Sequence, residues 1–317
     1  MPLTLEQYAS FLDTRNLPWP APPQVERPKA RPHLAPLPGV RAVLWNVYGT
    51  LLAISHGDLL FEHPQKFVME MALDKTVQEF KMWASMTRKP GQPAEQMGQM
   101  YAKVLGEQRL AIGGEKIPEV CAERLWEALI KKLLQKEYKF DASFYGALNE
   151  FSRKVAYFFH ASLQGTACYP GAAAALRHVT GAGLVQGLLA DGQCFTTVQL
   201  ARGLAKQDES ARPADLFDPD LCVLSCDLRA RKPAEKLFRQ ALAALKERGI
   251  DPGEVLHVGS RVAQDIAPAK RLGMRTALFA GDRASLAATP EQLREPGNRP
   301  DVLLTDLGQI ADVVRSP

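Results

Sequence analysis

The stretch VLWNVYGTL, residues 43–51, gives the clearest indication of a fold. It begins with three large apolar residues, Val43, Leu44 and Trp45, a run that is typical of a buried strand. Gly49 follows within a few residues, and glycine readily turns the chain after a strand. The stretch therefore predicts a buried strand that ends at Trp45 and opens into a glycine turn.

Beyond residue 170, short apolar runs alternate with segments of helical periodicity. Strands are predicted over residues 184–190, 221–224, 255–258, 276–279 and 302–304. Helices are predicted over residues 172–180, 197–204, 234–248 and 265–272. This alternation predicts an α/β fold, a Rossmann-like doubly wound parallel sheet with helices on both faces.

Two regions lack this alternation. Residues 55–164 show helical spacing and no strand pattern, so we expect a helical domain inserted into the sheet domain. Residues 1–39 contain nine of the 23 prolines, which fix φ and remove backbone donors, so we expect a Pro-rich extension. The predicted domains are the extension at 1–39, the α/β core at 40–54 and 165–317, and the helical insertion at 55–164.

The composition of the 317 residues argues against several classes of protein. A net charge of +4, from 39 basic and 35 acidic residues, is too small to indicate a nucleic-acid-binding surface. No apolar run approaches the roughly 20 residues of a membrane-spanning helix, and the first residues do not resemble a secretory signal. The five cysteines form no CxxC pair, so neither a zinc site nor a disulfide framework is indicated. We expect a cytoplasmic protein with no nucleic-acid or membrane partner.

Ligands of parallel sheets bind where the carboxyl ends of the strands meet. The residues that follow the predicted strands, or precede the helix at 234–248, should lie at this edge: Asn46, Tyr48, Gly49, Thr50, Ala190, Asp191, Lys232, Ser260 and Asp265. Lys232 stands just before a helix, where its charge and the helix dipole both favour an anion. These residues form the candidate site, and a small anion is the ligand that we expect there.

The order of these segments resembles the haloacid dehalogenase (HAD) superfamily, in its branch with a helical cap. The first motif of that family is a strand followed by Asp-x-Asp-Gly-Thr, and NVYGT at 46–50 matches it in the glycine and threonine. The second motif is a strand that ends in Ser or Thr, a place held here by LLADG at 188–192. The third is a lysine before a proline, as at Lys232, and the fourth has acids at the spacing of Ser260 and Asp265. The resemblance runs from about residue 40 to the C-terminus and implies a core with a cap.

The resemblance also implies a role for each candidate residue. Catalytic roles fall to Asn46, Tyr48, Lys232 and Asp265, and substrate-binding roles to Gly49, Thr50, Ala190, Asp191 and Ser260. In the phosphatases of the family, the first aspartate attacks phosphorus and the second transfers protons. The first position here is an amide, which carries no charge, and the second is a phenol, whose ordinary pKa is near 10. The second-motif hydroxyl is missing because that residue is alanine.

Metal binding is weakened in the same way. Ser260 stands where the family has the first acid of the fourth motif, which leaves Asp265 with Asp191 nearby. Mg²⁺ prefers oxygen ligands that include one or two carboxylates. We therefore expect no cofactor, although Mg²⁺ would be typical of the phosphatase branch.

Tyr48 and Ser260 also match the L-2-haloacid dehalogenases of the family, which carry Asp-x-Tyr-Gly-Thr and need no metal. Those enzymes still attack with the first aspartate, and Asn46 is no better a nucleophile toward carbon. They also use a second-motif serine and a fourth-motif asparagine, where this chain has Ala190 and Val262. The dehalogenase-like motif therefore indicates ancestry without restoring the activity.

Two functional hypotheses follow. In the first, the chain has lost aspartyl-nucleophile catalysis and acts as a pseudoenzyme that binds a small anion, a protein partner or a second copy of itself. In the second, it is an active HAD-type hydrolase, a phosphatase or a dehalogenase-like enzyme, in which Asp191 or Asp265 directs water. A simpler interpretation of Lys232 and Asp265 is that they pair and hold the fold.

Overall fold

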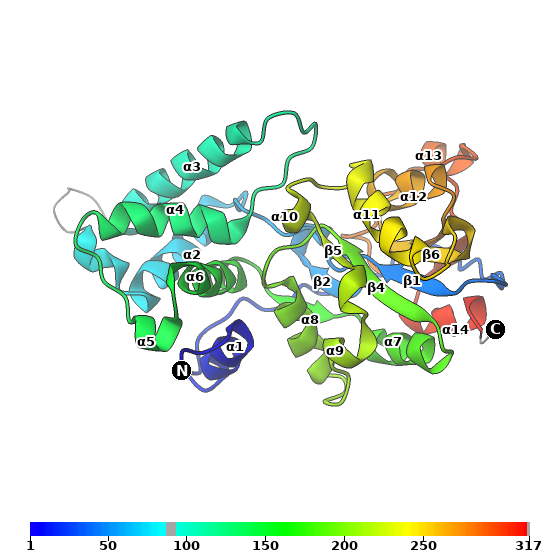
Figure 1. Cartoon of the computed structure of the whole chain (residues 1–317), viewed down its shortest axis with the longest axis horizontal. Coiled ribbons are helices and arrows are strands. Elements are labelled where there is room, and N and C mark those ends of the chain that lie inside the picture. Colours follow the sequence, from blue (N-terminus) through cyan, green and yellow to red (C-terminus); the bar gives the residue numbers. More distant parts are fainter. Residues whose placement is uncertain (87–92, 316–317) are drawn as a thin grey trace. The chain divides into compact units, whose positions relative to one another are not determined.

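The computed structural model describes residues 1–86 and 93–315. It divides the chain into two compact units, and Figure 1 labels the helices and many of the strands of both. The sheet unit contains Pro22–Asp58, Thr166–Gly192 and Gln199–Pro317. The helical unit contains Met1–Ala21, Leu59–Gly165 and Gln193–Val198.

The sheet unit is built on six parallel strands. Their order is β5 (Cys222–Leu224), β4 (Val185–Ala190), β1 (Ala42–Trp45), β6 (Val255–Gly259), β7 (Arg275–Phe279) and β8 (Val302–Leu304). The register places Trp45 beside Leu188 of β4 and Val258 of β6, so these three strands end at one edge. The predicted α/β, Rossmann-like doubly wound sheet is confirmed.

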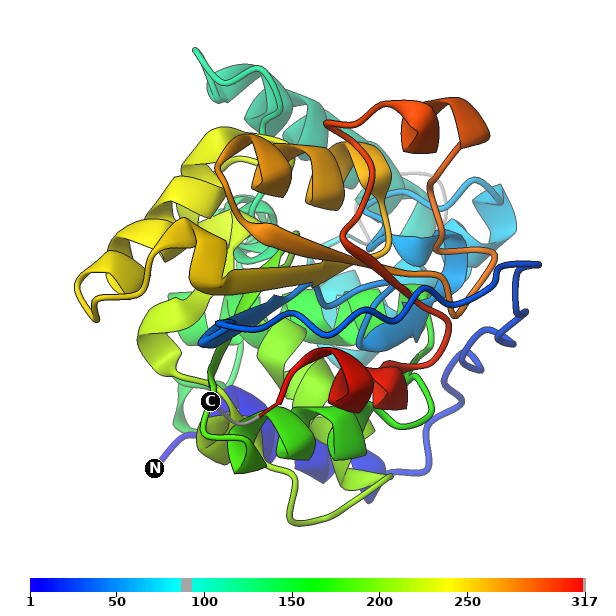
Figure 2. The same cartoon turned by 90° about the vertical axis from the view of Figure 1, so that its right-hand side faces the viewer.

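Helices cover both faces of this sheet (Figure 2). α11 (Glu235–Lys246) and α12 (Ala267–Arg271) lie on one face, and α7 (Ala172–Gly181) and α14 (Ile310–Val313) lie on the other. The apolar stripe of α11 includes Leu237 and Phe238, which pack in one core with Leu44 of β1. This packing anchors the strand that carries the first motif.

The remaining elements of the sheet unit are short. β2 (Leu52–Ile54) pairs antiparallel with β3 (Thr166–Cys168), a ribbon that the sequence patterns did not predict. The other short helices are η1 (Ser55–Gly57), α9 (Pro213–Leu216), η3 (Pro219–Leu221), α10 (Ser225–Leu228), η4 (Pro252–Glu254), α13 (Pro290–Arg294) and η6 (Leu307–Gln309). The helix predicted over 265–272 is instead a π-helical turn, η5 (Val262–Ile266), followed by α12.

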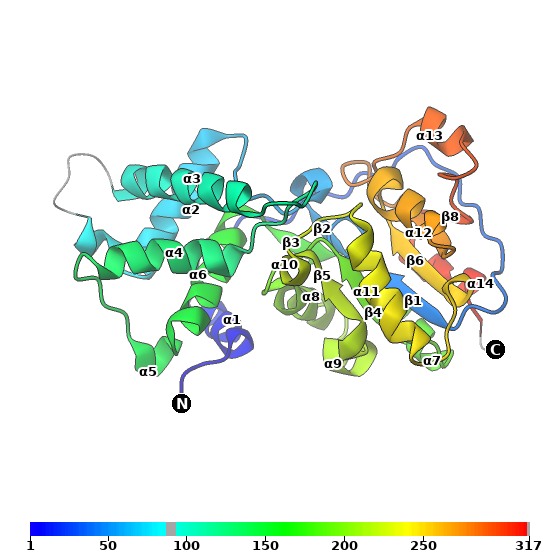
Figure 3. The ribbon, with the colours of Figure 1, turned by 45° about the horizontal axis from the view of Figure 1, so that its top comes forward.

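The helical unit consists of helices that pack against one another (Figure 3). Its main helices are α2 (Lys66–Glu79), α3 (Pro93–Ala111), α4 (Ala122–Leu134) and α6 (Leu148–Leu163), with the short η2 (Met82–Ser85) and α5 (Ala142–Tyr145). Tyr101, Trp126 and Phe159 contact one another at its centre. α8 (Thr196–Ala205) begins in this unit and continues in the sheet unit. Among the described residues, no helix is long and apolar enough to cross a bilayer.

The N-terminal segment differs from the single extension expected over 1–39. Residues 5–13 form the helix α1 (Leu5–Asp13), in which Thr4 and Gln7 make a capping box. Leu5, Tyr8 and Leu12 are buried, so α1 belongs to the helical unit. Residues from Pro22 onward belong to the sheet unit, where His33 makes two backbone hydrogen bonds of 2.9 Å with Leu303 of β8.

The other boundaries also lie at different residues from those expected. The chain leaves the sheet unit after Asp58 rather than after residue 54, and re-enters it at Thr166. Gln193–Val198, expected in the core, belongs to the helical unit. Residues 55–58 stay with the sheet unit, where the Asp58 carboxylate pairs with arginines of that unit.

Candidate functional site

The first-motif segment follows β1 into a tight turn. The Asn46 amide nitrogen donates to the Val258 carbonyl at 2.8 Å and so continues the pairing of β1 with β6. Gly49 has a φ of +79°, and a Cβ there would lie 2.9 Å from the Ser260 Oγ. Glycine is required at this position both for its backbone conformation and for the close approach of the 259–261 loop.

Lys232 is the centre of the candidate site. Its side chain is 2% exposed and that of Asp265 is 1% exposed, and the two form an ion pair. Lys232 Nζ also donates to the Asn46 Oδ1 at 2.9 Å and to the Leu189 carbonyl at 3.3 Å. An ammonium has three N–H donors. All three of these donors have protein acceptors: a carboxylate, an amide oxygen and a backbone carbonyl.

The Asn46 side chain is fixed from both ends. Its Nδ2 donates to the Tyr48 carbonyl at 2.8 Å and to the Thr50 Oγ1 at 3.3 Å. These two acceptors orient the amide so that its oxygen faces Lys232. The residue at the nucleophile position of the family therefore lies buried in a complete hydrogen-bond arrangement.

The Asp265 carboxylate is fixed by a backbone hydrogen bond as well as by the charge of Lys232. The Arg261 amide nitrogen donates to its Oδ2 at 3.0 Å, and a Cβ on Gly259 would fall only 2.3 Å from its Cγ. Burial alone would raise the pKa of this carboxyl, but the neighbouring Lys232 ammonium holds the pKa well below its usual range. Asp265 is therefore ionised and serves as the counter-ion of Lys232.

His257 lies beneath this pair in β6. Its Nδ1 is 3.0 Å from the Leu44 carbonyl, so Nδ1 carries the proton of the neutral ring. Its Nε2 is 3.6 Å from the Asp265 Oδ1. Burial lowers the pKa of His257, which keeps the ring neutral beside the Lys232 charge.

The remaining candidate residues differ in their burial and in their hydrogen-bond partners. The Tyr48 hydroxyl donates a hydrogen bond of 2.6 Å to the Gln199 Oε1. Asp191 accepts a 2.8 Å bond from the Lys232 backbone nitrogen, and burial raises the pKa of its carboxyl. Ala190 is buried at the end of β4. The Ser260 hydroxyl is buried and has no hydrogen-bond partner among the described residues.

Three charged residues near this site were not among the candidates. Asp58 accepts hydrogen bonds from the Arg261 Nη1 at 2.6 Å and from the Arg231 Nη2 at 3.4 Å. Arg231 Nε also lies 3.7 Å from the Asp191 Oδ2. The sequence offered one signal for the arginines, since each is adjacent to a motif residue, Lys232 or Ser260. No spacing pattern indicated Asp58.

The space at this edge is small. A cavity of about 10 Å³ is lined by Asn46, Tyr48, Asp58, Asp191, Lys232, Arg261, Gln264 and Asp265. That volume holds roughly one water molecule. The structure thus brings together five of the candidate residues, whereas Gly49, Thr50, Ala190 and Ser260 do not line the cavity.

The residues present do not fit the Mg²⁺ that the family resemblance would imply. Asp265 is neutralised by Lys232, and the Asn46 oxygen accepts from that same ammonium. Among residues 1–86 and 93–315, no group of three or more His, Cys, Asp or Glu side chains could hold a metal ion. A divalent cation would have to displace Lys232 to reach these oxygens.

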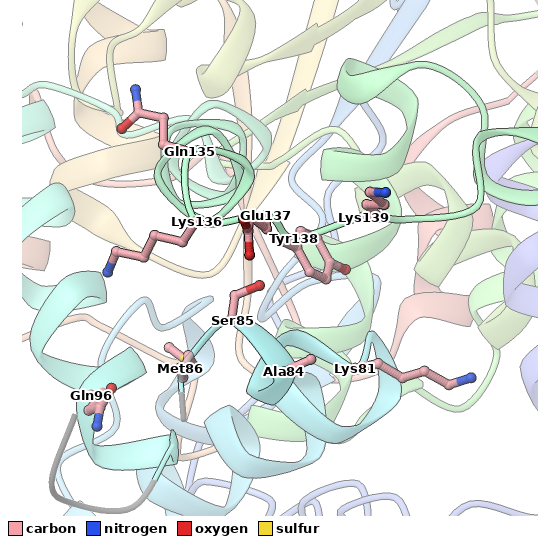
Figure 4. A pocket seen from close by; sticks show the side chains of 10 residues that line it. All are labelled: Lys81, Ala84, Ser85, Met86, Gln96, Gln135, Lys136, Glu137, Tyr138 and Lys139. Carbon is pink, nitrogen blue, oxygen red and sulfur yellow. The ribbon is translucent and has the colours of Figure 1, made fainter. Parts of the chain in front are cut away.

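A larger cavity, of about 670 Å³, lies within the helical unit (Figure 4). Its lining includes Ser85, Glu137 and three lysines, and Figure 4 shows the Lys81 and Lys136 side chains extending in different directions. Anion sites need charged groups that converge on one point. The lysines shown do not converge, so the edge of the sheet remains the candidate site.

Comparisons with known proteins agree with the fold. The HAD-hydrolase-like family model matches residues 229–310. A glyceraldehyde 3-phosphate phosphatase from Pyrococcus furiosus is 29% identical over 147 residues, 46% of this chain and 53% of that protein. The chain thus spans about half the length of this curated relative.

Solved structures extend the comparison to most of the chain. A 2-haloacid dehalogenase from Pseudomonas syringae pv. tomato DC3000 has a TM-score of 0.52 at 20% identity, covering 86% of this chain and 96% of its own. A HAD phosphatase from Thermococcus onnurineus has a TM-score of 0.46 at 17% identity, with coverage of 86% and 96%. The dehalogenase structure shows that the chain has the α/β fold that the motifs predicted, and the family model locates a similarity to HAD-type hydrolases in residues 229–310.

Proposed function

We propose that this chain is a HAD-like protein without aspartyl-nucleophile catalysis, which serves to bind a small anionic ligand. The anion-binding part of the proposal is supported by the partly exposed Arg231 and Arg261, which already contact the carboxylate of Asp58. The observation that carries the absence of catalysis is that every N–H donor of the Lys232 ammonium has an acceptor within the protein. Its three donors are directed at Asn46, Leu189 and Asp265, so none faces a substrate. An active phosphoryl-transfer site needs its cation directed at the transferring group.

The charge at position 46 supports the same proposal. A carboxylate there would be a nucleophile and a second counter-ion for Lys232, whereas the amide of Asn46 is neither. The amide completes a hydrogen-bond arrangement with Tyr48, Thr50 and Lys232. These contacts stabilise the fold at the place where the family performs chemistry.

The second hypothesis, a hydrolase with rearranged chemistry, rests on Asp191 and Asp265. Asp265 is a poor base because Lys232 lowers its pKa. Asp191 is the better candidate because burial raises the pKa of its carboxyl. Its oxygens are already engaged by the Lys232 backbone and by Arg231, which reduces its capacity to bind a water molecule.

The experiment is a turnover assay of the natural chain, with p-nitrophenyl phosphate plus Mg²⁺ and with L-2-chloropropionate without metal. We expect no turnover in either assay. The variants Asp191→Asn and Asp265→Asn are assayed in parallel, with circular dichroism to establish that each is folded. Turnover by the natural chain that either variant abolishes would contradict the proposal and support the rearranged hydrolase.

Asn46→Asp tests the origin of the inactivity. The restored carboxylate still faces a lysine that Asp265 neutralises, so we expect at most slow turnover from this single change. Asn149→Asp, an equal charge change at an exposed position, is the matched control. Fast turnover by Asn46→Asp would show that the rest of the machinery is intact.

A further inference from the structure

Two arginines from different parts of the sheet unit meet at one carboxylate. Arg231 precedes α11 and Arg261 follows β6, and both contact Asp58, at 3.4 Å and 2.6 Å. The two arginines engage different oxygens, Oδ1 and Oδ2, so the carboxylate is bridged between two guanidinium groups. Guanidinium groups are well suited to carboxylates and phosphates, and here each of the two contributes one hydrogen bond.

This bridge lies beside the candidate site. Asp58 and Arg261 line the same small cavity as Asn46 and Lys232. The backbone nitrogen of Arg261 donates to Asp265, so the residue that carries this guanidinium is fixed to the site. Arg231 is fixed by its neighbour, since Lys232 is bonded to Asp191 through its backbone nitrogen.

The bridge is also partly open to solvent. The side chains of Arg231 and Asp58 are each 32% exposed and that of Arg261 is 14% exposed. Asp58 lies on the short segment after β2 and η1, the last residue of this stretch of the sheet unit. A dissolved anion could therefore reach the guanidinium groups if the Asp58 carboxylate withdrew, whereas the fully buried Lys232 is out of its reach.

We propose that Arg231 and Arg261 form a binding position for a small oxyanion, a carboxylate or a phosphate, which Asp58 occupies as an internal anion. Asp58 is then a competitor that sets the affinity for the external ligand. This inference rests on the anion-binding role proposed above and assigns its ligand to the arginine pair rather than to Lys232. A ligand binds by displacing the Asp58 carboxylate from the two guanidinium groups, so each arginine exchanges one anionic partner for another and Asp58 moves into solvent.

The test removes the competitor. Binding of inorganic phosphate to the natural chain, Asp58→Ala and Asp58→Asn is measured by calorimetry at constant ionic strength, and acetate replaces phosphate in a second series. We expect Asp58→Ala to bind phosphate at least about tenfold more tightly than the natural chain, because an internal anion no longer competes. Asp58→Asn keeps the side-chain volume and provides the test should the alanine variant be unstable. An equal rise in acetate affinity in the Asp58 variants would indicate a carboxylate ligand. A rise in affinity that is confined to phosphate would indicate a phosphate ligand.

Asp215→Ala is the matched control. Asp215 pairs with Arg212 at 2.7 Å in the same unit, so this change removes one carboxylate from one arginine and alters the net charge equally. We expect it to leave phosphate affinity unchanged, and we expect Arg261→Gln to abolish the gain in the Asp58→Ala background. No gain in either Asp58 variant, or an equal gain in Asp215→Ala, would overturn the inference.

The result of this binding experiment does not depend on whether the chain catalyses a reaction. Binding of phosphate is measured without turnover, so hydrolysis by the natural chain would contradict the proposed function while leaving the role of Asp58 standing. Conversely, an inactive chain whose Asp58 variants gain no affinity would retain the proposed function and refute this site.

Discussion

Because residue 46 is an asparagine, Lys232 has one carboxylate partner at the edge of the sheet, and that partner is Asp265. The pair is almost completely buried, and its remaining hydrogen-bonding groups are satisfied by Leu189, Asn46 and the Arg261 backbone. Removal of one member of a buried pair leaves an uncompensated charge, which costs far more than the loss of an exposed pair. In the function proposed above, Asn46, Lys232 and Asp265 therefore act as structural elements of the core.

Lys232→Met tests this structural role. We expect the free energy of unfolding to fall by about 3–5 kcal/mol at neutral pH, because Asp265 loses its counter-ion in a buried environment. Lys66→Met is the matched control, since Lys66 pairs with Glu70 on an exposed helix face. Chemical denaturation of the two variants measures the difference. Equal, small losses would show that the Lys232–Asp265 pair does not stabilise the fold.

His160 supplies a separate prediction in the helical unit. It is 1% exposed among the rings of Phe61, Phe159 and Phe195, and burial lowers its pKa to about 3. The unfolded chain binds a proton at this residue below about pH 6.5, whereas the folded chain stays neutral. The folded state therefore loses stability as the pH falls from about 6.5 to about 3.

His160→Phe should remove this pH dependence. Between pH 6.5 and pH 5 the natural chain should lose about 1.7 kcal/mol more stability than the variant, because the loss approaches about 1.4 kcal/mol per pH unit for one proton only below the unfolded pKa. Urea denaturation at each pH measures the loss. His33→Phe, at an exposed position, is the control and should follow the natural chain. Parallel pH profiles for the natural chain and His160→Phe would contradict a neutral, buried His160.

Among the elements, α1 shows how a helix escaped the sequence analysis. The prolines from Pro18 onward made the first 39 residues look like one extension. The helix signals were nevertheless present, with a capping box at Thr4 and Gln7 and apolar residues at 5, 8, 9 and 12. The many prolines of the whole segment predicted an extended chain, and this prediction was preferred to the short helical pattern near its start.

Leu12→Ala measures how firmly α1 is packed. Leu12 is 1% exposed, so we expect a loss of about 2–5 kcal/mol in the free energy of unfolding. Leu110→Ala is the same substitution at a residue that is 86% exposed, and it should have little effect. If the two variants unfold at the same denaturant concentration, α1 does not stabilise the helical unit.

The strands and the motif residues were far easier to predict than the charged residues around them. Asn46, Lys232 and Asp265 each follow a strand or precede a helix, so sheet topology alone brings them together. Asp58 reaches Arg261 from 203 positions away in the sequence, through a turn that the sequence assigned to the helical insertion. Long-range side-chain pairs of this kind have no periodic signal, whereas buried strands and amphipathic helices do.

For the whole molecule, the net charge of +4 does not reveal which residues stand at the edge of the sheet, where the resemblance to the HAD superfamily implies acids. Positions 46, 48 and 260 carry an amide, a phenol and a hydroxyl in place of the acids of the family's phosphatases.

The described residues contain no cluster of metal-ligating side chains. Ligands that bind only the folded state raise its melting temperature. We expect that neither excess Mg²⁺ nor EDTA shifts Tm in differential scanning calorimetry, with Ca²⁺ as the control for nonspecific effects of ionic strength. A rise in Tm specific to Mg²⁺ would show that a metal site survives.

The most direct measurement of the central claim is a crystal structure of the natural chain grown with Mg²⁺ and orthovanadate, an analogue of a transferring phosphoryl group. We predict that Lys232 Nζ stays within hydrogen-bond distance of the Asn46 oxygen and paired with Asp265, as in the 2.9 Å contact described above, with neither ion bound between them. Vanadate and Mg²⁺ bound against Asn46, with Lys232 turned toward the vanadate oxygens, would contradict the account.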